Sequence, residues 1–228
     1  MEILSYLNKI LAETQNIHID TIRASFFKNA VTKKRFSKME LLKRIAKNHS
    51  LKWRKMQDAK EIKIAGRYEF RGLKIINIYE LENLSIFYAT TKAPNDCRQK
   101  AIIEFYGLRQ YHKPAPPPHL ISELLDAINN VSSIDLCYDS HTPFNLDAFK
   151  IIRYGSTAYV KAEFGTLQRI YFYDKALKND LGFSLYRAEA TAPIIDLNKP
   201  ALLPKAERLE LQLRQAVSDF KQIIDLAV

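Results

Sequence analysis

Carboxylates lie within otherwise apolar, strand-like runs at several places in this sequence. In residues 133–139, strand alternation puts Asp135, Cys137 and Asp139 on one face. Glu104 and Glu210 have similar apolar neighbours, and alternation over 205–213 predicts a strand there as well. Charged side chains are rarely buried unpaired. Clustered carboxylates favour a hard cation such as Mg²⁺ or Mn²⁺ among them, whereas a sheet with one solvated face explains the same alternation.

A second run with chemical potential contains Tyr171, Tyr173, Asp174 and Lys175. A tyrosine can attack phosphorus covalently, and a lysine near a metal can neutralise a phosphate in a transition state. The alternative is an aromatic-rich strand that ends in a turn. Glycine-rich phosphate loops and the histidine spacings of common metal sites are absent from the sequence.

The excess positive charge of the chain lies in one segment. Residues 28–55 contain eleven Lys/Arg and one acid, Glu40, a local charge of +10 that equals the net charge of +10 of the whole chain. Such a segment favours a nucleic-acid surface, with a solvated face or an anionic-lipid surface as the alternatives. The candidate DNA-binding residues are Lys33, Lys34, Arg35, Lys38, Lys43, Arg44, Lys47, Lys52, Arg54 and Lys55.

The hydrophobic periodicity predicts an α+β fold, a mostly antiparallel sheet with helices packed on it and a basic helical segment near the N-terminus. Ser37 is a plausible N-cap for a helix over 38–48, and Trp53 and Met56 could belong to a second short helix. Helices are also expected over 119–130 and 145–153. We divide the chain into a basic strand–helix segment, residues 1–60, and a catalytic region, residues 61–228.

Composition favours a reducing cytoplasmic location. The two cysteines, Cys97 and Cys137, show no zinc-type spacing and cannot form a disulfide framework. No apolar stretch approaches the roughly 20 residues that a membrane span needs, and the N-terminus does not have the pattern of a signal peptide.

Four segments, in this order along the chain, resemble the replication initiation factor (Rep_trans) family of rolling-circle plasmid and phage initiators. They are Ile103-Glu104-Phe105, Ile134-Asp135-Leu136-Cys137-Tyr138-Asp139, Arg169-Ile170-Tyr171-Phe172-Tyr173-Asp174-Lys175 and Arg208-Leu209-Glu210-Leu211-Gln212-Leu213. The family pattern has a glutamate strand, an apolar-Asp-Leu-x-x-Asp strand, an Arg-Ile-Tyr-x-Lys run and an Arg-x-Glu-x-Glu-Leu strand. Gln212 departs from this pattern, where the family tends to have a second acid.

The resemblance implies nicking of one DNA strand through a tyrosine that stays bound to the 5′ phosphate, with a divalent ion, Mg²⁺ or Mn²⁺, polarising the scissile phosphate. The family's nucleophile position falls at or next to Phe220, whose ring has no oxygen. Three explanations stay open: Phe220 replaces a tyrosine, the nucleophile is Tyr171 or Tyr173, or the protein binds DNA without cutting it. The expected metal ligands are Asp135 and Glu210, with Asp139 and Glu104 as further candidates and Lys175 as a phosphate contact.

We therefore expect a site-specific nicking–closing endonuclease that initiates rolling-circle DNA replication. Its expected partners are double-stranded and single-stranded DNA at a replication origin, and a host helicase and a second copy of the chain are candidate protein partners. One alternative is a non-catalytic, sequence-specific DNA-binding regulator. Another is an RNA-binding protein that uses its Tyr/Phe-rich strands as a stacking sheet.

Overall fold

The computed structural model describes residues 3–14, 16–28, 36–56, 75–91, 100–111, 114–195 and 197–228. Its helices are α1 (Ile3–Ala12), α2 (Lys38–Asn48), α4 (Pro118–Ile128), α5 (Lys175–Asn179) and α6 (Lys205–Ala227). Its strands are β1 (Ile17–Phe27), β2 (Trp53–Lys55), β3 (Ile75–Leu81), β4 (Ile86–Thr91), β5 (Lys100–Tyr106), β6 (Ser133–Ser140), β7 (Ile151–Tyr154), β8 (Thr157–Val160), β9 (Gln168–Asp174) and β10 (Tyr186–Pro193).

The described strands form one 10-stranded sheet in the order β2-β3-β4-β5-β1-β6-β10-β9-β8-β7. Strands β2, β3, β4 and β5 pair antiparallel, each with the next. The pairings from β6 through β10, β9 and β8 to β7 are also antiparallel. The predicted α+β class is confirmed. The chain divides into two compact units, which we describe separately: the first comprises residues 1–4, 23–107 and 115–131, and the second comprises residues 5–22, 108–114 and 132–228.

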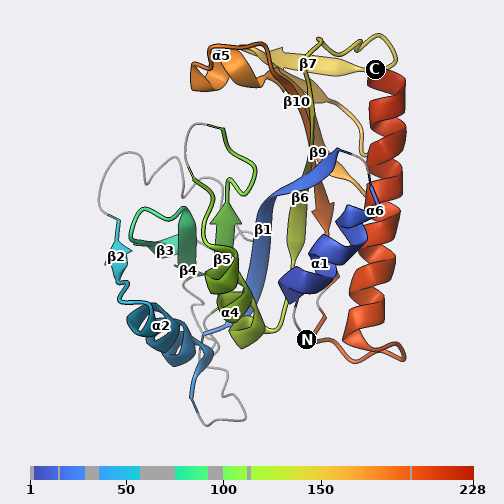
Figure 1. Cartoon of the computed structure of the whole chain (residues 1–228). Coiled ribbons are helices and arrows are strands. Elements are labelled where there is room, and N and C mark those ends of the chain that lie inside the picture. Colours follow the sequence, from blue (N-terminus) through green and yellow to red (C-terminus); the bar gives the residue numbers. More distant parts are fainter. Residues whose placement is uncertain are drawn as a thin grey trace. The chain divides into compact units, whose positions relative to one another are not determined.

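In the first unit, helices α2 and α4 lie side by side (Figure 1). Helix α2 begins where the sequence predicts, because Ser37 accepts a hydrogen bond from the backbone of Glu40 and the Glu40 carboxylate accepts one from the Ser37 backbone. This capping box satisfies two backbone donors that the first helical turn leaves open. Met39, Leu42 and Ala46 form the buried side of α2.

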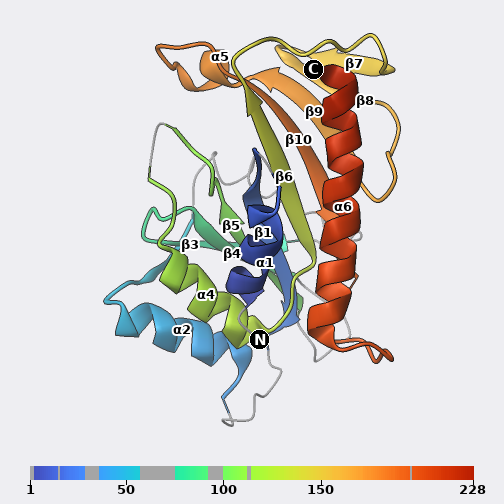
Figure 2. The same ribbon diagram turned by 45° about the vertical axis from the view of Figure 1, so that its right-hand side comes forward.

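In the second unit, the long helix α6 lies along β10 and β6 (Figures 1 and 2). Every second residue of β10 is an alanine, Ala188, Ala190 and Ala192, and these pair with Tyr138, Leu136 and Ile134 of β6. Small side chains at these positions let a helix approach the sheet closely. The buried stripe of α6 includes Leu209, Leu213, Ala216, Phe220 and Ile223, so this apolar face of the sheet and α6 form the core of the unit.

Three local predictions are wrong. Residues 205–213 begin α6 and do not form a strand, because the apolar residues of 205–227 continue at helical spacing and bury one stripe. Residues 53–55 form edge strand β2, where Trp53 packs edge-on against Tyr88 with ring centroids 5.1 Å apart. Residues 145–153, predicted as a helix, contain turns followed by β7.

Candidate active site

The face of the second unit's sheet that does not carry the alanines is polar. On β10, Arg187, Glu189 and Thr191 pair with Asp139, Cys137 and Asp135 of β6. On the other side, Arg187 pairs with Tyr173 and Glu189 with Tyr171 of β9. Paired residues on neighbouring strands point to the same face of a sheet. Carboxylates, tyrosines and an arginine therefore gather on one surface, which we call the polar cluster.

Arg187 is the centre of the polar cluster. Its side chain is fully buried, and it forms two hydrogen bonds with Asp139, of 2.6 and 2.8 Å, and one of 2.7 Å with Asp20 of β1. A fourth hydrogen bond, 2.9 Å long, goes to the backbone carbonyl of Arg109. Tyr111 donates at 2.8 Å to Asp139 Oδ2, the oxygen that also accepts from Arg187 Nη2. A paired, bidentate guanidinium is the arrangement in which a buried arginine is stable.

Two tyrosines share one carboxylate beside Arg187. The hydroxyl of Tyr173 donates to Glu189 Oε1 at 2.6 Å, and the hydroxyl of Tyr171 donates to Glu189 Oε2. Lys175 Nζ lies 3.5 Å from the Tyr173 hydroxyl, and Arg187 Nη1 lies 3.6 Å from Glu189 Oε1. Tyrosine hydroxyls, a carboxylate and two cations thus lie in one chain of contacts, the groups from which an activated hydroxyl nucleophile could be built.

Burial and neighbouring charges raise the pKa of some groups in the polar cluster and lower the pKa of others. Burial, followed by the negative charge of Glu189, raises the pKa of Asp20 to about 6. For Asp139, burial acts in the same direction, but the hydrogen bonds and charge of Arg187 outweigh it and hold the pKa below its usual value. Burial and the Glu189 carboxylate raise the pKa of both Tyr171 and Tyr173. Burial and the charge of Arg187 lower the pKa of Lys175.

A buried aspartate on α6 fixes the turn that leads into β9. Asp219 accepts hydrogen bonds from the backbone N–H and the hydroxyl of Thr166, at 2.6 and 2.8 Å. Gly165 has a φ of +56°, and a Cβ there would lie 2.3 Å from the Asp219 carboxylate. Only glycine fits this close approach in a left-handed conformation. The turn holds β9, and hence Tyr171 and Tyr173, in register.

The structure separates the predicted metal ligands. Asp135 is in the polar cluster, where it accepts a hydrogen bond of 2.8 Å from Thr191. Glu210 lies on α6 and is bound to Tyr6 at 2.7 Å and to Arg214 at 2.8 Å. Glu104 belongs to the first unit, where it pairs with Arg23 at 2.8 Å. Within the described residues, no three His, Cys, Asp or Glu side chains converge in a way that could hold a metal ion.

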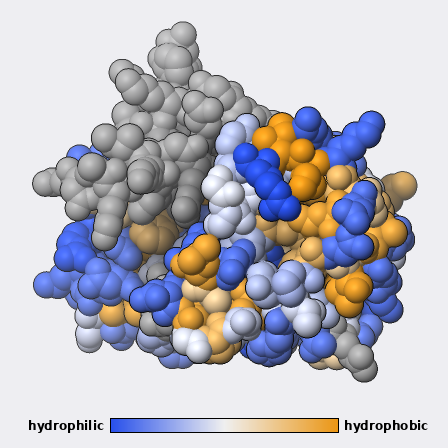
Figure 3. Space-filling model, turned by 90° about the horizontal axis from the view of Figure 1, so that it is seen from above, coloured by the Kyte–Doolittle hydropathy of each residue, from blue (hydrophilic) through white to orange (hydrophobic). Residues whose placement is uncertain are grey.

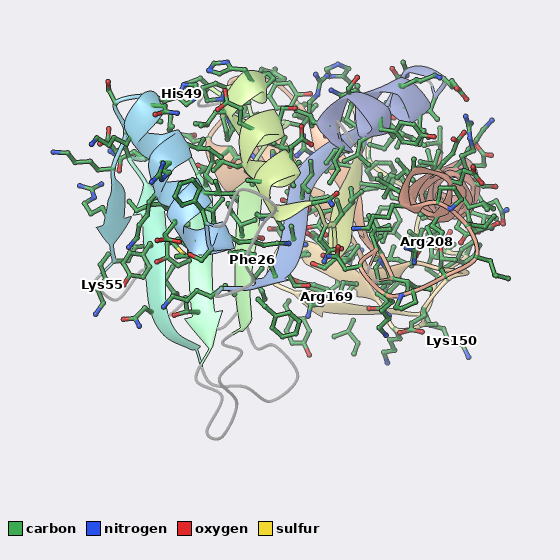
Figure 4. The ribbon with its side chains drawn as sticks, turned by 90° about the horizontal axis from the view of Figure 1, so that it is seen from below. Phe26, His49, Lys55, Lys150, Arg169 and Arg208 are labelled. Atoms are coloured by element: carbon green, nitrogen blue, oxygen red, sulfur yellow. The ribbon has the colours of Figure 1, made fainter. Side chains whose placement is uncertain are left out.

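Arg208 and Phe220, both on α6, make contacts that stabilise the fold. Arg208 donates to the carbonyl of Leu197 at 2.7 Å and lies beside the α6 ribbon (Figure 4). Phe220 is 0% exposed, so its ring belongs to the core that α6 forms. A nucleophile must lie about 3–3.5 Å from the phosphorus that it attacks, and a fully enclosed ring does not meet this condition. The structure gives no support to Phe220 as the nucleophile position.

We expect the substitution Phe220→Tyr to destabilise the protein. It places a hydroxyl in the core, and a buried polar group without a partner costs about 1–3 kcal/mol. Urea denaturation should show this loss relative to wild type. Phe183→Tyr, at a side chain that is 48% exposed, is the matched control and should change the stability by less than about 0.5 kcal/mol. Unchanged stability of Phe220→Tyr would mean that the hydroxyl finds a partner or water.

Asp20, Arg187 and Glu189 are the cluster members that the sequence interpretation missed. The signal for the last two is an Arg-x-Glu spacing within 186–191, an alternating run that follows the Tyr-Asp-Lys segment. The same spacing at 208–210 lies on a helix. The signal for Asp20 is the Ile-Asp pair of 19–20, which the pair at 134–135 repeats.

The predicted basic surface is present on the first unit. Lys43, Arg44 and Lys47 of α2 are exposed, as are Lys52, Arg54 and Lys55, whereas Lys38 is half-buried. A shallow hollow lined by Lys43, Lys47, Lys52 and Trp53, among others, lies between α2 and β2. Figure 4 shows Lys55 pointing outward from β2. Lys33, Lys34 and Arg35 lie outside the described residues.

Comparison with known protein families finds none that matches the chain, and comparison with curated proteins finds no match either. Within the part of the chain that the structure describes, no helix has the length and apolar character needed to cross a membrane.

Proposed function

We propose that this chain cuts and rejoins one strand of DNA through a tyrosine of the polar cluster, the activity that its resemblance to rolling-circle initiators implies. One observation carries the proposal: the hydroxyls of Tyr171 and Tyr173 both donate to Glu189, while Lys175 lies 3.5 Å from the Tyr173 hydroxyl and Arg187 lies 3.6 Å from the Glu189 carboxylate. Tyr173 is only 5% exposed, whereas Tyr171 is half-buried. Tyr171 is therefore the better candidate nucleophile.

In the proposed reaction, Glu189 takes the proton of Tyr171 as its oxygen attacks the phosphorus of a phosphodiester. The new bond joins the tyrosine oxygen to the phosphorus, and the bond from phosphorus to the 3′ oxygen breaks. The 3′ oxygen leaves with the bonding electron pair and takes up the proton that Glu189 accepted, so the strand ends in a free 3′ hydroxyl on one side, while its 5′ phosphate stays on the tyrosine. Attack by that hydroxyl reverses the step and rejoins the strand. Lys175 and Arg187 supply positive charge for the phosphate oxygens as negative charge develops on them.

A divalent cation, Mg²⁺ or Mn²⁺, belongs to the proposal because the polar cluster offers carboxylate oxygens beside the candidate nucleophile. Asp20, Asp135, Asp139 and Glu189 contribute carboxylates, and Arg187 and Lys175 contribute the cations. Carboxylate oxygens such as those of Asp135 and Glu189 are of the type that these ions prefer, and phosphate oxygens of the DNA would supply the further ligands that the described residues do not bring together. A bound cation would polarise the scissile phosphate.

The proposal is tested by nicking of supercoiled DNA from the genetic element that encodes this chain. With Mg²⁺ or Mn²⁺, wild type should convert it to the open circular form, and Tyr171→Phe should lose this activity. Tyr173→Phe, which removes the neighbouring hydroxyl from the same carboxylate, is the matched comparison and should keep most of it. Loss in Tyr173→Phe alone would transfer the role to Tyr173, and activity in the double variant would contradict the proposal.

A second candidate is a regulator that binds DNA without cutting it, and the exposed cations of α2 favour it. Such a protein would bind through Lys43, Arg44 and Lys47 and show no metal-dependent nicking. Both candidates need this surface, so the nicking assay separates them.

Replacing Lys43, Arg44 and Lys47 together with alanine should weaken duplex binding, because each lost phosphate contact reduces the number of counterions that binding releases from the DNA. The log–log salt slope should flatten by roughly 0.9 per lost contact, measured by fluorescence anisotropy over a salt series. Lys221, an exposed lysine of α6 in the second unit, provides the control variant Lys221→Ala. Equal slopes for the triple variant and wild type would show that the charge of α2 is only solvated surface.

A further inference from the structure

A row of tyrosine rings runs across the outer strands of the second unit and ends at the polar cluster. Tyr154 of β7 lies 5.7 Å from Tyr159 of β8, Tyr159 lies 5.5 Å from Tyr171 of β9, and Tyr171 lies 6.0 Å from Tyr173, measured between ring centroids. We call these residues the tyrosine row. They lie on the polar-cluster face because Tyr159 pairs with Tyr171, and Tyr171 pairs with Glu189.

The tyrosine row is open to solvent at one end and buried at the other. Tyr154 is 68% exposed and Tyr159 39% exposed, whereas Tyr173 is 5% exposed. Large aromatic side chains at an exposed sheet edge contribute little to a core, so their stability gain is small. Aromatic faces that lead from solvent to a reactive hydroxyl are instead suited to planar ligands.

Positive charge lies next to the tyrosine row. Lys150 and Lys161 are exposed, and strand alternation puts them on the same face as Tyr154 and Tyr159. The Lys161 N–H donates to the Lys150 carbonyl at 2.8 Å. Arg169 is exposed at a bulge of β9, with a φ of 51°. In Figure 4, Lys150 and Arg169 lie away from α6. Aromatic faces with neighbouring cations are the combination that binds single-stranded nucleic acid, whose bases stack while its phosphates meet the charges.

We propose that Tyr154 and Tyr159 form a stacking platform for the bases of an unpaired DNA strand and lead it to Tyr171. This inference rests on the proposed function for its choice of DNA, since the strand bound on the platform is the one that the polar cluster would cut. The platform is distinct from the basic surface of α2, which is suited to phosphates of a duplex.

The platform is tested by the binding of a fluorescent oligo(dT) strand in EDTA, where metal-dependent cutting does not occur. Stacking contributes roughly 1–3 kcal/mol per base, so the double variant Tyr154→Ala/Tyr159→Ala should bind at least about tenfold more weakly. The double variant Tyr154→Phe/Tyr159→Phe keeps the rings and should bind like wild type. Duplex binding should be the same in all three proteins.

Exposed apolar groups are also found among hydrophilic neighbours on the face of the molecule that Figure 3 shows. Leu177→Ala, at a side chain that is 71% exposed on α5, is therefore the control and should not change oligo(dT) binding. As a second readout, photo-crosslinking of 5-iododeoxyuridine strands should label the peptides that contain Tyr154 or Tyr159.

Equal oligo(dT) affinity of the alanine variant, or crosslinks only outside the tyrosine row, would overturn the platform. Tighter binding of oligo(rU) than of oligo(dT) by tenfold or more would overturn its assignment to DNA. These results leave the nicking proposal in place, because that proposal depends on Tyr171 and is measured with metal. Conversely, a platform that binds normally in a protein without nicking activity would contradict only the proposed function.

Discussion

Substitution of Arg187 by methionine is expected to destabilise the protein by about 3–5 kcal/mol, the cost of leaving a buried charge without its partner. Arg187 is 0% exposed and binds Asp20 and Asp139 through three hydrogen bonds. Methionine fills similar space but removes the cation that is hydrogen-bonded to both carboxylates. Chemical denaturation followed by circular dichroism would measure the change.

The loss in Arg187→Met should depend on pH. In wild type the pKa of Asp139 lies below its unfolded value, so this group stabilises the fold above that value and the contribution disappears as the pH falls through the folded pKa. Without the guanidinium, burial raises the pKa of Asp139, and the native state then binds more protons than the unfolded state. As the pH falls from 7 to about 5, the free energy of unfolding of the variant should therefore rise relative to that of wild type.

Two further variants separate charge from packing at this position. Arg187→Met combined with Asp139→Asn removes one uncompensated carboxylate and should recover part of the lost stability. Arg214→Met, on the exposed pair with Glu13 and Glu210, should lower the stability far less than Arg187→Met, because exposed ion pairs contribute little. A similar cost for Arg187→Met and Arg214→Met would mean that Arg187 does not hold the carboxylates together.

Replacing Glu189 by glutamine should reduce the nicking rate by about 10²–10⁴-fold, the usual contribution of a positioned general base. The amide has nearly the same shape as the carboxylate and accepts a hydrogen bond from one tyrosine, but it cannot take the proton of Tyr171. Single-turnover nicking of supercoiled DNA measures the rate. Oligo(dT) binding should change little, because the tyrosine row stays in place.

Glu207→Gln is the matched control, since Glu207 is an exposed residue of α6. It should nick DNA at the wild-type rate. If Glu189→Gln also kept the wild-type rate, the proton of the nucleophile would have another acceptor. In that case Glu189 would serve only to position the two tyrosines.

Local patterns predicted those elements whose signals are contained in their own residues. Ser37 marks the start of α2 through its capping box with Glu40, and the helix has the predicted bounds, 38–48. The strand prediction for 205–213 was wrong because alternating leucines also fit one stripe of a helix. Only the continuation of the apolar stripe to Ala227 distinguishes the helix from a strand.

The candidate site was only partly predictable, because its members meet through pairings between distant strands. Asp135, Asp139, Tyr171, Tyr173 and Lys175 were identified from their own runs and lie in the polar cluster. The centre, Arg187, belongs to a strand that was not predicted, since alternating alanines give a weak apolar signal. Its contact with Asp20 spans 167 residues of sequence, a separation that no local pattern encodes.

The most direct test of the account is mass spectrometry of the protein after reaction with single-stranded DNA from its own genetic element and Mn²⁺. We expect a covalent adduct in which a peptide containing Tyr171 carries the 5′ phosphate of the cut strand. The adduct should be absent from Tyr171→Phe and present in Tyr154→Phe/Tyr159→Phe. Nicked DNA without any tyrosine adduct, or an adduct that persists in Tyr171→Phe, would contradict the account.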